Sequence, residues 1–351
     1  MIHCYYSIVL ELVSEVAYLE CINRDASQID QKKLLLDSIF SHKLDFVKDY
    51  FRLKETPFSF RRDILYSKLN EGIDDGTFSL TELTKLLDRI EEFGNQHIYL
   101  YNCNSEYIKV LKNAEYIKEK LRYRNLESLY NNENLIILPN EPTLTSVIHD
   151  NNILKFKWVE KRVWKDPLDE RIEEDKLVKT YQINLSRGIT TFRIDLVSGD
   201  AEIMIQRLPR GANYENIKNN YLDELSHYIE IHSLNPLSLR RSIRRLEESD
   251  EVDKRQIDLE TIEGGRVAYK SRDRRSDYQS DSSLSRSRTA LGHDVSGNKG
   301  SFYWKANNIL ERPILTHIYA KDKRLGIFGQ CIEQEVNYVL SRVRYFASQE
   351  S

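Results

Sequence analysis

Three acidic residues are spaced closely enough in the sequence to suggest metal-dependent hydrolysis. Asp195, Asp200 and Glu202 lie on or beside a short predicted hairpin turn. Carboxylates on adjacent strands can hold Mg²⁺ and orient a water molecule for attack on a phosphodiester. The common nuclease pattern also has a lysine two residues after the glutamate, but Met204 stands there. A divalent-metal nuclease is therefore kept as an alternative, and we assign no catalytic and no metal-binding residue.

Other catalytic signatures are missing from the sequence. His227 and His232 are five residues apart, so they do not share one face of a helix. The sequence contains no P-loop, no dinucleotide-binding glycine pattern and no hydrolase nucleophile elbow, so we predict no cofactor. Widely spaced cysteines without a Cys-x-x-Cys pair favour a reducing intracellular setting, cytoplasmic or nuclear. The four cysteines are Cys4, Cys21, Cys103 and Cys331.

Binding chemistry is best indicated by residues 264–300, a glycine-bounded stretch rich in Arg, Ser and Asp. From Gly264 onward there are 15 Lys and Arg against 9 Asp and Glu, although the whole chain has a net charge of -3. Arginine binds phosphate oxygens in pairs, and aromatic side chains stack on bases. We therefore predict a flexible basic loop that contacts the phosphate backbone of DNA or RNA. Its binding residues are predicted to be Arg266, Lys270, Arg272, Arg274, Arg275, Arg286, Arg288 and Lys299.

An interpretation without a binding role also stays open for this segment. Asp273, Asp277 and Asp281 offset part of its positive charge, as they would in a solvated surface insertion.

A second basic cluster precedes the loop. Arg240, Arg241 and Arg244 fall on a predicted helix and are predicted to face phosphates together with the loop. Glu247 and Glu248 follow at spacings that form ion pairs within a helix, so a salt-bridged surface helix is the alternative.

The first 138 residues are predicted to form a helical domain that docks a protein partner. Apolar residues recur at helical spacing over 31–50, 61–71, 80–93 and 107–131. Ser79 and Glu82 have the spacing of a capping box, which predicts a helix start.

The segment Cys4–Ile22 is predicted to be an amphipathic helix. Its apolar face consists of Ile8, Leu12, Val16 and Leu19, while three glutamates interrupt the apolar run. That charge excludes a membrane span.

Residues 139–351 are predicted to form a second domain of the α+β class, with an antiparallel sheet covered by helices. Pro139 and Pro142 mark the boundary, and beyond them the apolar period changes to two. Ser198–Asp200 suits a hairpin turn. Helices are expected over 213–231, 236–249 and 330–346, with residues 252–258 as a charged linker. Further strands are expected around Arg266, Phe302 and Thr316.

The order of these modules resembles the centromere protein N family. The resemblance is carried by the helix Phe78–Asp88 and by the following stretch Gly94–Tyr99. That family has a helical, death-fold-like N-terminal domain followed by an α/β domain with a basic groove that faces DNA. The resemblance implies a non-catalytic adaptor that contacts DNA and protein partners, and it assigns no individual contact residue.

We therefore expect a non-catalytic nucleic-acid-binding adaptor or accessory subunit of a larger complex, in genome maintenance or defence. The alternatives are the divalent-metal nuclease and a purely structural protein-interaction subunit.

Overall fold

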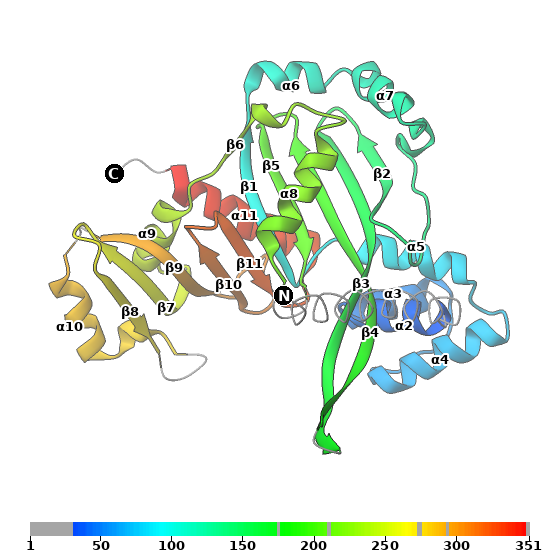
Figure 1. The fold of residues 1–351 in the computed structure, drawn as a ribbon, viewed down its shortest axis with the longest axis horizontal. Helices are drawn as coiled ribbons and strands as arrows, with labels where there is room; N and C mark the ends of the chain where they lie inside the picture. The colour runs from blue at the N-terminus through cyan, green and yellow to red at the C-terminus, as the bar shows by residue number, and fades with distance from the viewer. Residues whose placement is uncertain (1–30, 174–175, 209–211, 272–275, 293–294, 349–351) are drawn as a thin grey trace, which may run out of the picture.

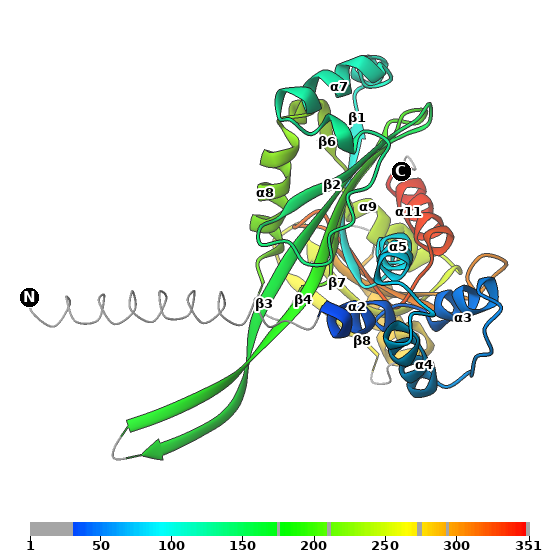
Figure 2. The ribbon, with the colours of Figure 1, turned by 90° about the vertical axis from the view of Figure 1, so that its right-hand side faces the viewer.

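The computed structural model describes residues 31–348, apart from 174–175, 209–211, 272–275 and 293–294. The fold is α+β: helices come first, followed by one eleven-stranded antiparallel sheet that carries helices on both faces (Figures 1 and 2). The predicted fold class is therefore confirmed. No helix within the described ranges has the length and apolar character needed to cross a bilayer.

The strands run in the order β2-β3-β4-β5-β1-β11-β10-β9-β7-β8, and the short β6 pairs with β1. They are β1 (Gln96–Cys103), β2 (Thr143–His149), β3 (Ile153–Glu173), β4 (Lys176–Asp195), β5 (Asp200–Gln206), β6 (Leu234–Pro236), β7 (Val252–Thr261), β8 (Arg266–Lys270), β9 (Val295–Trp304), β10 (Ile314–Tyr319) and β11 (Arg324–Phe328). The α-helices are α2 (Gln31–Phe40), α3 (Leu44–Leu53), α4 (Arg62–Asp74), α5 (Leu80–Ile90), α6 (Ser105–Leu111), α7 (Ala114–Tyr123), α8 (Tyr214–Leu225), α9 (Arg240–Glu248), α10 (Ser282–Ala290) and α11 (Glu333–Ser348).

Strand β1 occupies the middle of the sheet although it precedes every other strand in the sequence. It pairs with β5 on one side and with β11 on the other. The predicted division between residues 138 and 139 would therefore separate β1 from the strands to which it is hydrogen-bonded. The purely helical part of the described chain is α2–α5, which we call the helical unit, and the sheet begins at Gln96.

The alternation of side chains along β1 separates two cores. Ile98 and Leu100 pack with α9 and α11 on one face, whereas Tyr99 and Tyr101 pack with α6, α7 and α8 on the other. Helix α10 lies on the α9 side, because Leu284 packs against the same core. One face of the β7–β11 half is thus covered by α9, α10 and α11, and we call its opposite face the open face.

Buried ion pairs attach the helical unit to the sheet. The Lys157 side chain on β3 is 0% exposed, and its Nζ lies 2.6 Å from Asp88 and 3.1 Å from Glu91 on α5 and the residue after it. Arg187 on β4 binds both oxygens of Glu91 at 2.8 Å. Burial alone would lower the pKa of Lys157, but the surrounding carboxylates raise it. Burial alone would also raise the pKa of Glu91, but Lys157 and Arg187 hold it at about 2.

Several predicted elements match the structure. The Ser79 hydroxyl accepts a hydrogen bond from the backbone N–H of Glu82 at 3.1 Å and caps α5, as the capping-box spacing predicts. Residues 196–199 form the turn between β4 and β5, which contains Ser198 and Gly199 of the predicted hairpin turn.

Three predicted elements differ from the structure. The expected helix over 31–50 is two helices, because the chain turns at Ser41–Lys43. The expected helix over 107–131 is α6, α7 and a short 3-10 turn, since Asn113 caps a new helix start with its side chain. The expected linker 252–258 is the internal strand β7. Val252, Ile257 and Leu259 are buried in this strand. The charged residues between them made the segment resemble a linker in the sequence.

The prediction that residues 264–300 form a loop is also wrong. It contains β8, a 3-10 turn, α10 and the start of β9. Tyr278 is buried and donates its hydroxyl hydrogen to Glu247 on α9. Arg288 binds both oxygens of the same carboxylate, at 2.6 and 2.8 Å. One buried glutamate therefore holds this segment against α9 by binding a tyrosine and an arginine. The composition of the segment had suggested that both side chains would be exposed to solvent.

Replacing Lys157 by methionine should lower the free energy of unfolding by about 3–5 kcal/mol, because it leaves buried carboxylates without their cation. Guanidinium denaturation followed by circular dichroism measures the change. The matched control is Lys109→Met, which removes an exposed partner of Glu106 and should cost less than about 1 kcal/mol. Equal losses in the two variants would contradict the assigned role of Lys157.

Acid should destabilise the fold through His42, which lies buried beside Glu91. Burial lowers the pKa of His42 from 6.5 to about 4, with Glu91 opposing the shift and Lys157 adding to it. The neutral ring is favoured in the folded state, so its contribution is complete above pH 6.5 and is lost as the pH falls toward 4. Between pH 7.5 and 4, His42→Gln should lose roughly 3 kcal/mol less unfolding free energy than the natural chain. Identical pH profiles from urea denaturation would refute this.

Candidate nucleic-acid interface

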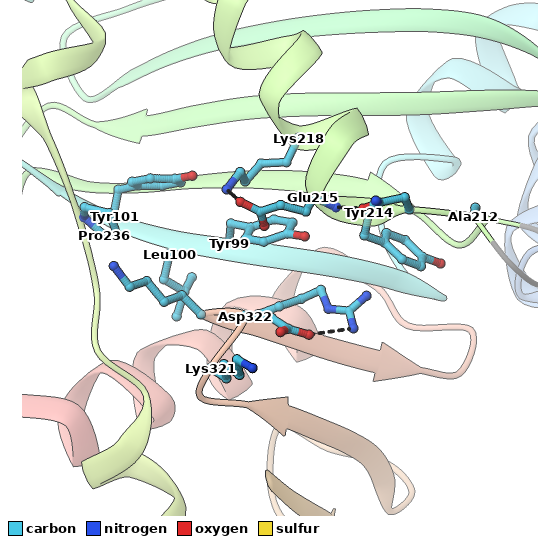
Figure 3. A pocket seen from close by; sticks show the side chains of 13 residues that line it. Tyr99, Leu100, Tyr101, Ala212, Tyr214, Glu215, Lys218, Pro236, Lys321 and Asp322 are labelled. Atoms are coloured by element: carbon cyan, nitrogen blue, oxygen red, sulfur yellow. Dashed lines mark hydrogen bonds and ion pairs between the residues drawn. The ribbon is translucent and has the colours of Figure 1, made fainter. Parts of the chain in front are cut away.

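A basic, aromatic groove runs where the start of α8 meets β1 and the β10–β11 hairpin (Figure 3). Two adjoining hollows form it, and they share Ala212, Tyr214 and Arg324. We call this the α8 groove. Its aromatic lining consists of Tyr99, Tyr101, Tyr214, Tyr319, Trp164, Phe328, His97 and His317. One end of the groove opens toward the β3–β4 hairpin through Trp164, and the other reaches Pro236.

Local hydrogen bonds fix the helical wall of the groove. The Asn213 side chain accepts from the backbone N–H groups of Glu215 and Asn216, at 3.0 and 3.2 Å, and so caps the start of α8. The Tyr214 hydroxyl accepts from the backbone N–H of Leu208 at 2.8 Å, which ties the helix start to the end of β5. The first turn of α8 is therefore held over β1 by polar side chains that the sequence supplies locally.

The guanidinium of Arg324 lies between two aromatic rings of the groove. Its guanidinium carbon lies 4.8 Å from the centre of the Tyr214 ring and 4.5 Å from that of Tyr319. It also donates to Asp322 at 3.2 Å. Contacts with two rings orient the guanidinium plane and leave its Nε buried without a described hydrogen-bond partner. Arg324 thus positions positive charge at the junction of the two hollows.

Two histidines in the groove remain neutral at neutral pH. Burial, followed by Arg324 and Arg207, lowers the pKa of His97 to about 3. Burial, followed by Lys299 and Arg255, lowers the pKa of His317 to about 4. The His97 ring packs at a tilt against Tyr214 and the His317 ring against Phe328, with ring centres 4.0 and 4.5 Å apart. The histidines therefore act as aromatic lining, and Lys and Arg supply the charge.

The lining of the groove carries more positive than negative charge. Its basic residues are Arg207, Lys218, Lys321, Lys323 and Arg324, and its carboxylates are Asp166, Glu215 and Asp322. Lys218 pairs with Glu215, and Arg324 with Asp322, as the dashed lines in Figure 3 show. Arg207, Lys321 and Lys323 form no ion pair with any carboxylate of the described ranges, and all three are exposed. These three cations are available to an anionic ligand.

One predicted binding residue, Lys299, lies beside this groove, and two others lie on the same face of the sheet. Lys299 is opposite Tyr319 in the β9–β10 pair, with its Nζ 5.5 Å from the tyrosine ring centre. Arg266 and Lys270 on the edge strand β8 alternate with Tyr269, which is buried on the α10 side. Strand alternation therefore places both on the open face, the same face as Lys299. Strand β7 lies between Lys299 on β9 and the two residues on β8, so the structure brings these three together only loosely.

The other predicted residues lie elsewhere. Arg240, Arg241 and Arg244 are on α9 and Arg286 and Arg288 on α10, against the opposite face of the sheet. Arg288 is engaged by Glu247, and Arg240 donates to Ser296 at 3.2 Å. Arg272, Arg274 and Arg275 lie outside the described residues.

The three carboxylates considered for metal binding have structural partners. Glu202 lies between Arg193 at 2.5 Å and Arg344 at 3.1 Å. Asp200 also binds Arg344, at 3.0 Å, and Asp195 accepts the backbone N–H groups of the turn that follows it. Within the described ranges, no three His, Cys, Asp or Glu side chains gather in a way that would hold a metal ion.

Most residues of the α8 groove were not predicted from the sequence to be binding residues. Arg207, Lys218 and Arg324 are far apart in the chain, and only the pairing of β1 with β5 and β11 brings their elements together. One signal was available: the hairpin turn Lys321–Arg324 is basic and follows an aromatic residue, Tyr319.

No known protein-family model matches this chain, and comparison with curated proteins gives no match.

Proposed function

We propose that this protein is a non-catalytic nucleic-acid-binding adaptor, and that the α8 groove and the adjoining open face hold the phosphate backbone. One observation carries the proposal: three exposed cations of the groove have no carboxylate partner among the described residues. They lie beside the aromatic side chains that line the groove. Arg207, Lys321 and Lys323 provide this charge, although the chain as a whole is acidic. A local basic groove on an acidic protein supports binding to a polyanion.

The chemistry of the groove favours contacts with phosphate and sugar over the reading of base edges. Lysine is a flexible point charge, so Lys321 and Lys323 carry little information about sequence. The aromatic rings are already in contact with cations or histidines of the protein, as Tyr319 and Phe328 are. Binding is therefore expected to depend strongly on salt and weakly on nucleotide sequence.

An adaptor also needs a second surface, and the helical unit offers one. Leu53 is 82% exposed and Phe60 is 76% exposed on this unit. Large apolar side chains with such exposure are typical of protein-interaction sites when they gather on one surface. We propose that the helical unit docks a protein partner, in an intracellular complex of genome maintenance or defence, cytoplasmic or nuclear.

The two alternatives are less well supported. A nuclease would need Asp195, Asp200 or Glu202 free to bind a metal, but arginines or a turn backbone engage them. A purely structural subunit would give no role to the three groove cations that lack a carboxylate partner in the described part of the chain.

Replacing Arg207, Lys321 and Lys323 together by alanine should weaken binding to duplex DNA and to single strands of any sequence. Losing three phosphate contacts should flatten the plot of log affinity against log salt by about two to three units. Fluorescence anisotropy over a salt series measures this. Stability should change by less than about 0.5 kcal/mol per site, because all three side chains are exposed.

The matched control removes three exposed cations from outside the groove, Lys112, Arg241 and Arg286. It changes the net charge equally, so it should leave the salt slope nearly intact. If both triple variants weaken binding equally, the groove is not the site. If the natural protein shows no salt-dependent affinity for DNA or RNA, the proposed function is wrong.

A further inference from the structure

The hollow of the α8 groove that contains Trp164 has a floor made of aromatic rings. Directly opposed positions on three neighbouring strands form the floor, because His97 on β1 and His317 on β10 both pair with Gly326 on β11. Phe328, two residues further along β11, belongs to the same face of the sheet as Gly326. We call this hollow the Phe328 hollow, and its volume of about 960 Å³ is that of a ligand pocket.

Gly326 lets the Phe328 ring lie across the floor. A Cβ atom at position 326 would stand 2.8 Å from Cε2 of Phe328 and 3.1 Å from Cε1 of His97. The phenyl ring therefore occupies the space that a side chain at position 326 would need. Its centre lies 4.5 Å from that of His317 and 5.6 Å from that of His97. Three rings from three strands thus make one continuous aromatic surface.

The floor is uncharged, whereas a cation lies above it. Because burial lowers the pKa of both histidines, their rings are neutral at neutral pH. Arg207 is exposed and lies over the Phe328 ring, with its guanidinium carbon 5.8 Å from the ring centre. An uncharged floor suits a flat, uncharged ring, and the guanidinium suits a phosphate attached to that ring. A nucleotide combines these two groups.

A base fits between Phe328 and Arg207 after a small movement. Stacked planes lie about 3.5 Å apart, so a base between the two side chains needs about 7 Å. The present distance of 5.8 Å falls short of this by about 1 Å. Arg207 is exposed and has no carboxylate partner in the described ranges, so its side chain can move outward. It would then stack on the outer face of the base.

A duplex does not present a base to such a floor. In double-stranded DNA or RNA both faces of each base are stacked on neighbouring bases, and extruding one base is costly. An unpaired base avoids that cost, and every base has a face that can stack on an aromatic side chain. The Phe328 hollow therefore favours strands with unpaired bases, whatever their sequence.

We propose that the Phe328 hollow holds one unpaired base, stacked between Phe328 and Arg207, and that the ligand of the groove is single-stranded nucleic acid. This assignment rests on the proposed function, because the phosphates of the same strand would lie along Lys321 and Lys323 in the adjoining hollow.

Fluorescence anisotropy with two labelled strands of equal length separates the contribution of the bases from that of the phosphates. One strand is oligothymidylate, and the other is its abasic analogue, which has the same phosphates without bases. At about 200 mM salt, where phosphate contacts are weakened, the natural protein should bind oligothymidylate at least about fivefold more tightly than the abasic strand. It should also bind oligothymidylate more tightly than the duplex of oligothymidylate with oligoadenylate. A tighter duplex would overturn the proposal.

Phe328→Leu keeps an apolar side chain but removes the aromatic ring. It should reduce the preference for oligothymidylate over the abasic strand to less than about twofold, whereas Phe328→Tyr should retain the preference. The matched control is Tyr123→Leu, which removes a ring that is 92% exposed on α7, outside the groove, and should also retain it. A preference that survives Phe328→Leu would overturn the proposal.

Trp164 provides a readout that needs no change at Phe328. It lines the hollow and is half-buried, whereas Trp158 and Trp304 are buried. Oligothymidylate should therefore quench tryptophan emission more than the abasic strand does, and Trp164→Phe should remove the difference.

The two proposals fail in different ways. If the natural protein binds neither strand even at low salt, the proposed function is wrong and the base site falls with it. If the natural protein binds both strands equally and both quench Trp164 equally, the groove holds phosphates alone, and only the base site is wrong.

Discussion

The buried ion pairs of Lys157 and Arg187 are the interaction on which the arrangement of this molecule depends. The apolar core of the helical unit is separate from both cores of the sheet, so apolar packing alone does not unite them. Asp88, Glu91 and Glu92 supply the contact instead, all within or just after α5. A docking geometry that separated these partners would leave unpaired buried charges, which are strongly destabilising. The position of α2 beside the β3–β4 hairpin follows from the geometry that keeps them paired.

Unequal covering of the sheet creates the α8 groove. Helices on the α9 side extend across the β7–β11 half, whereas α8 on the other side packs against the β2–β5 half. The groove lies at the step where α8 stops covering strands. The rings of Tyr214 and Tyr319 are half-buried there, and the guanidinium of Arg324 contacts both of them. The same step leaves room for a ligand.

The fold class and many elements could be predicted from the sequence, because they depend on local periodicity and capping. The alternation of β3 and the Ser79 cap are examples. The prediction failed where the structure of a segment depends on a residue that is far away in the sequence. Glu247 converts the supposed loop into packed structure by binding Tyr278 and Arg288, which follow it by 31 and 41 residues. Strand β7 was likewise hidden, since its charged residues gain neighbours only from β8 and β9. The groove is non-local for the same reason.

The central place of β1 has a consequence for biosynthesis. Its partner β5 is made about a hundred residues later, and β11 follows only near residue 324. At roughly 5 to 20 residues per second, the edge of β1 that receives β11 waits roughly ten to forty-five seconds on the ribosome. During that interval an aromatic strand presents unpaired backbone groups, which are a template for misassociation. The edge of β1 that pairs with β11 therefore stays open until β11 has been made, whereas α6 and α7, which follow β1 directly, can cover one face of the strand much earlier.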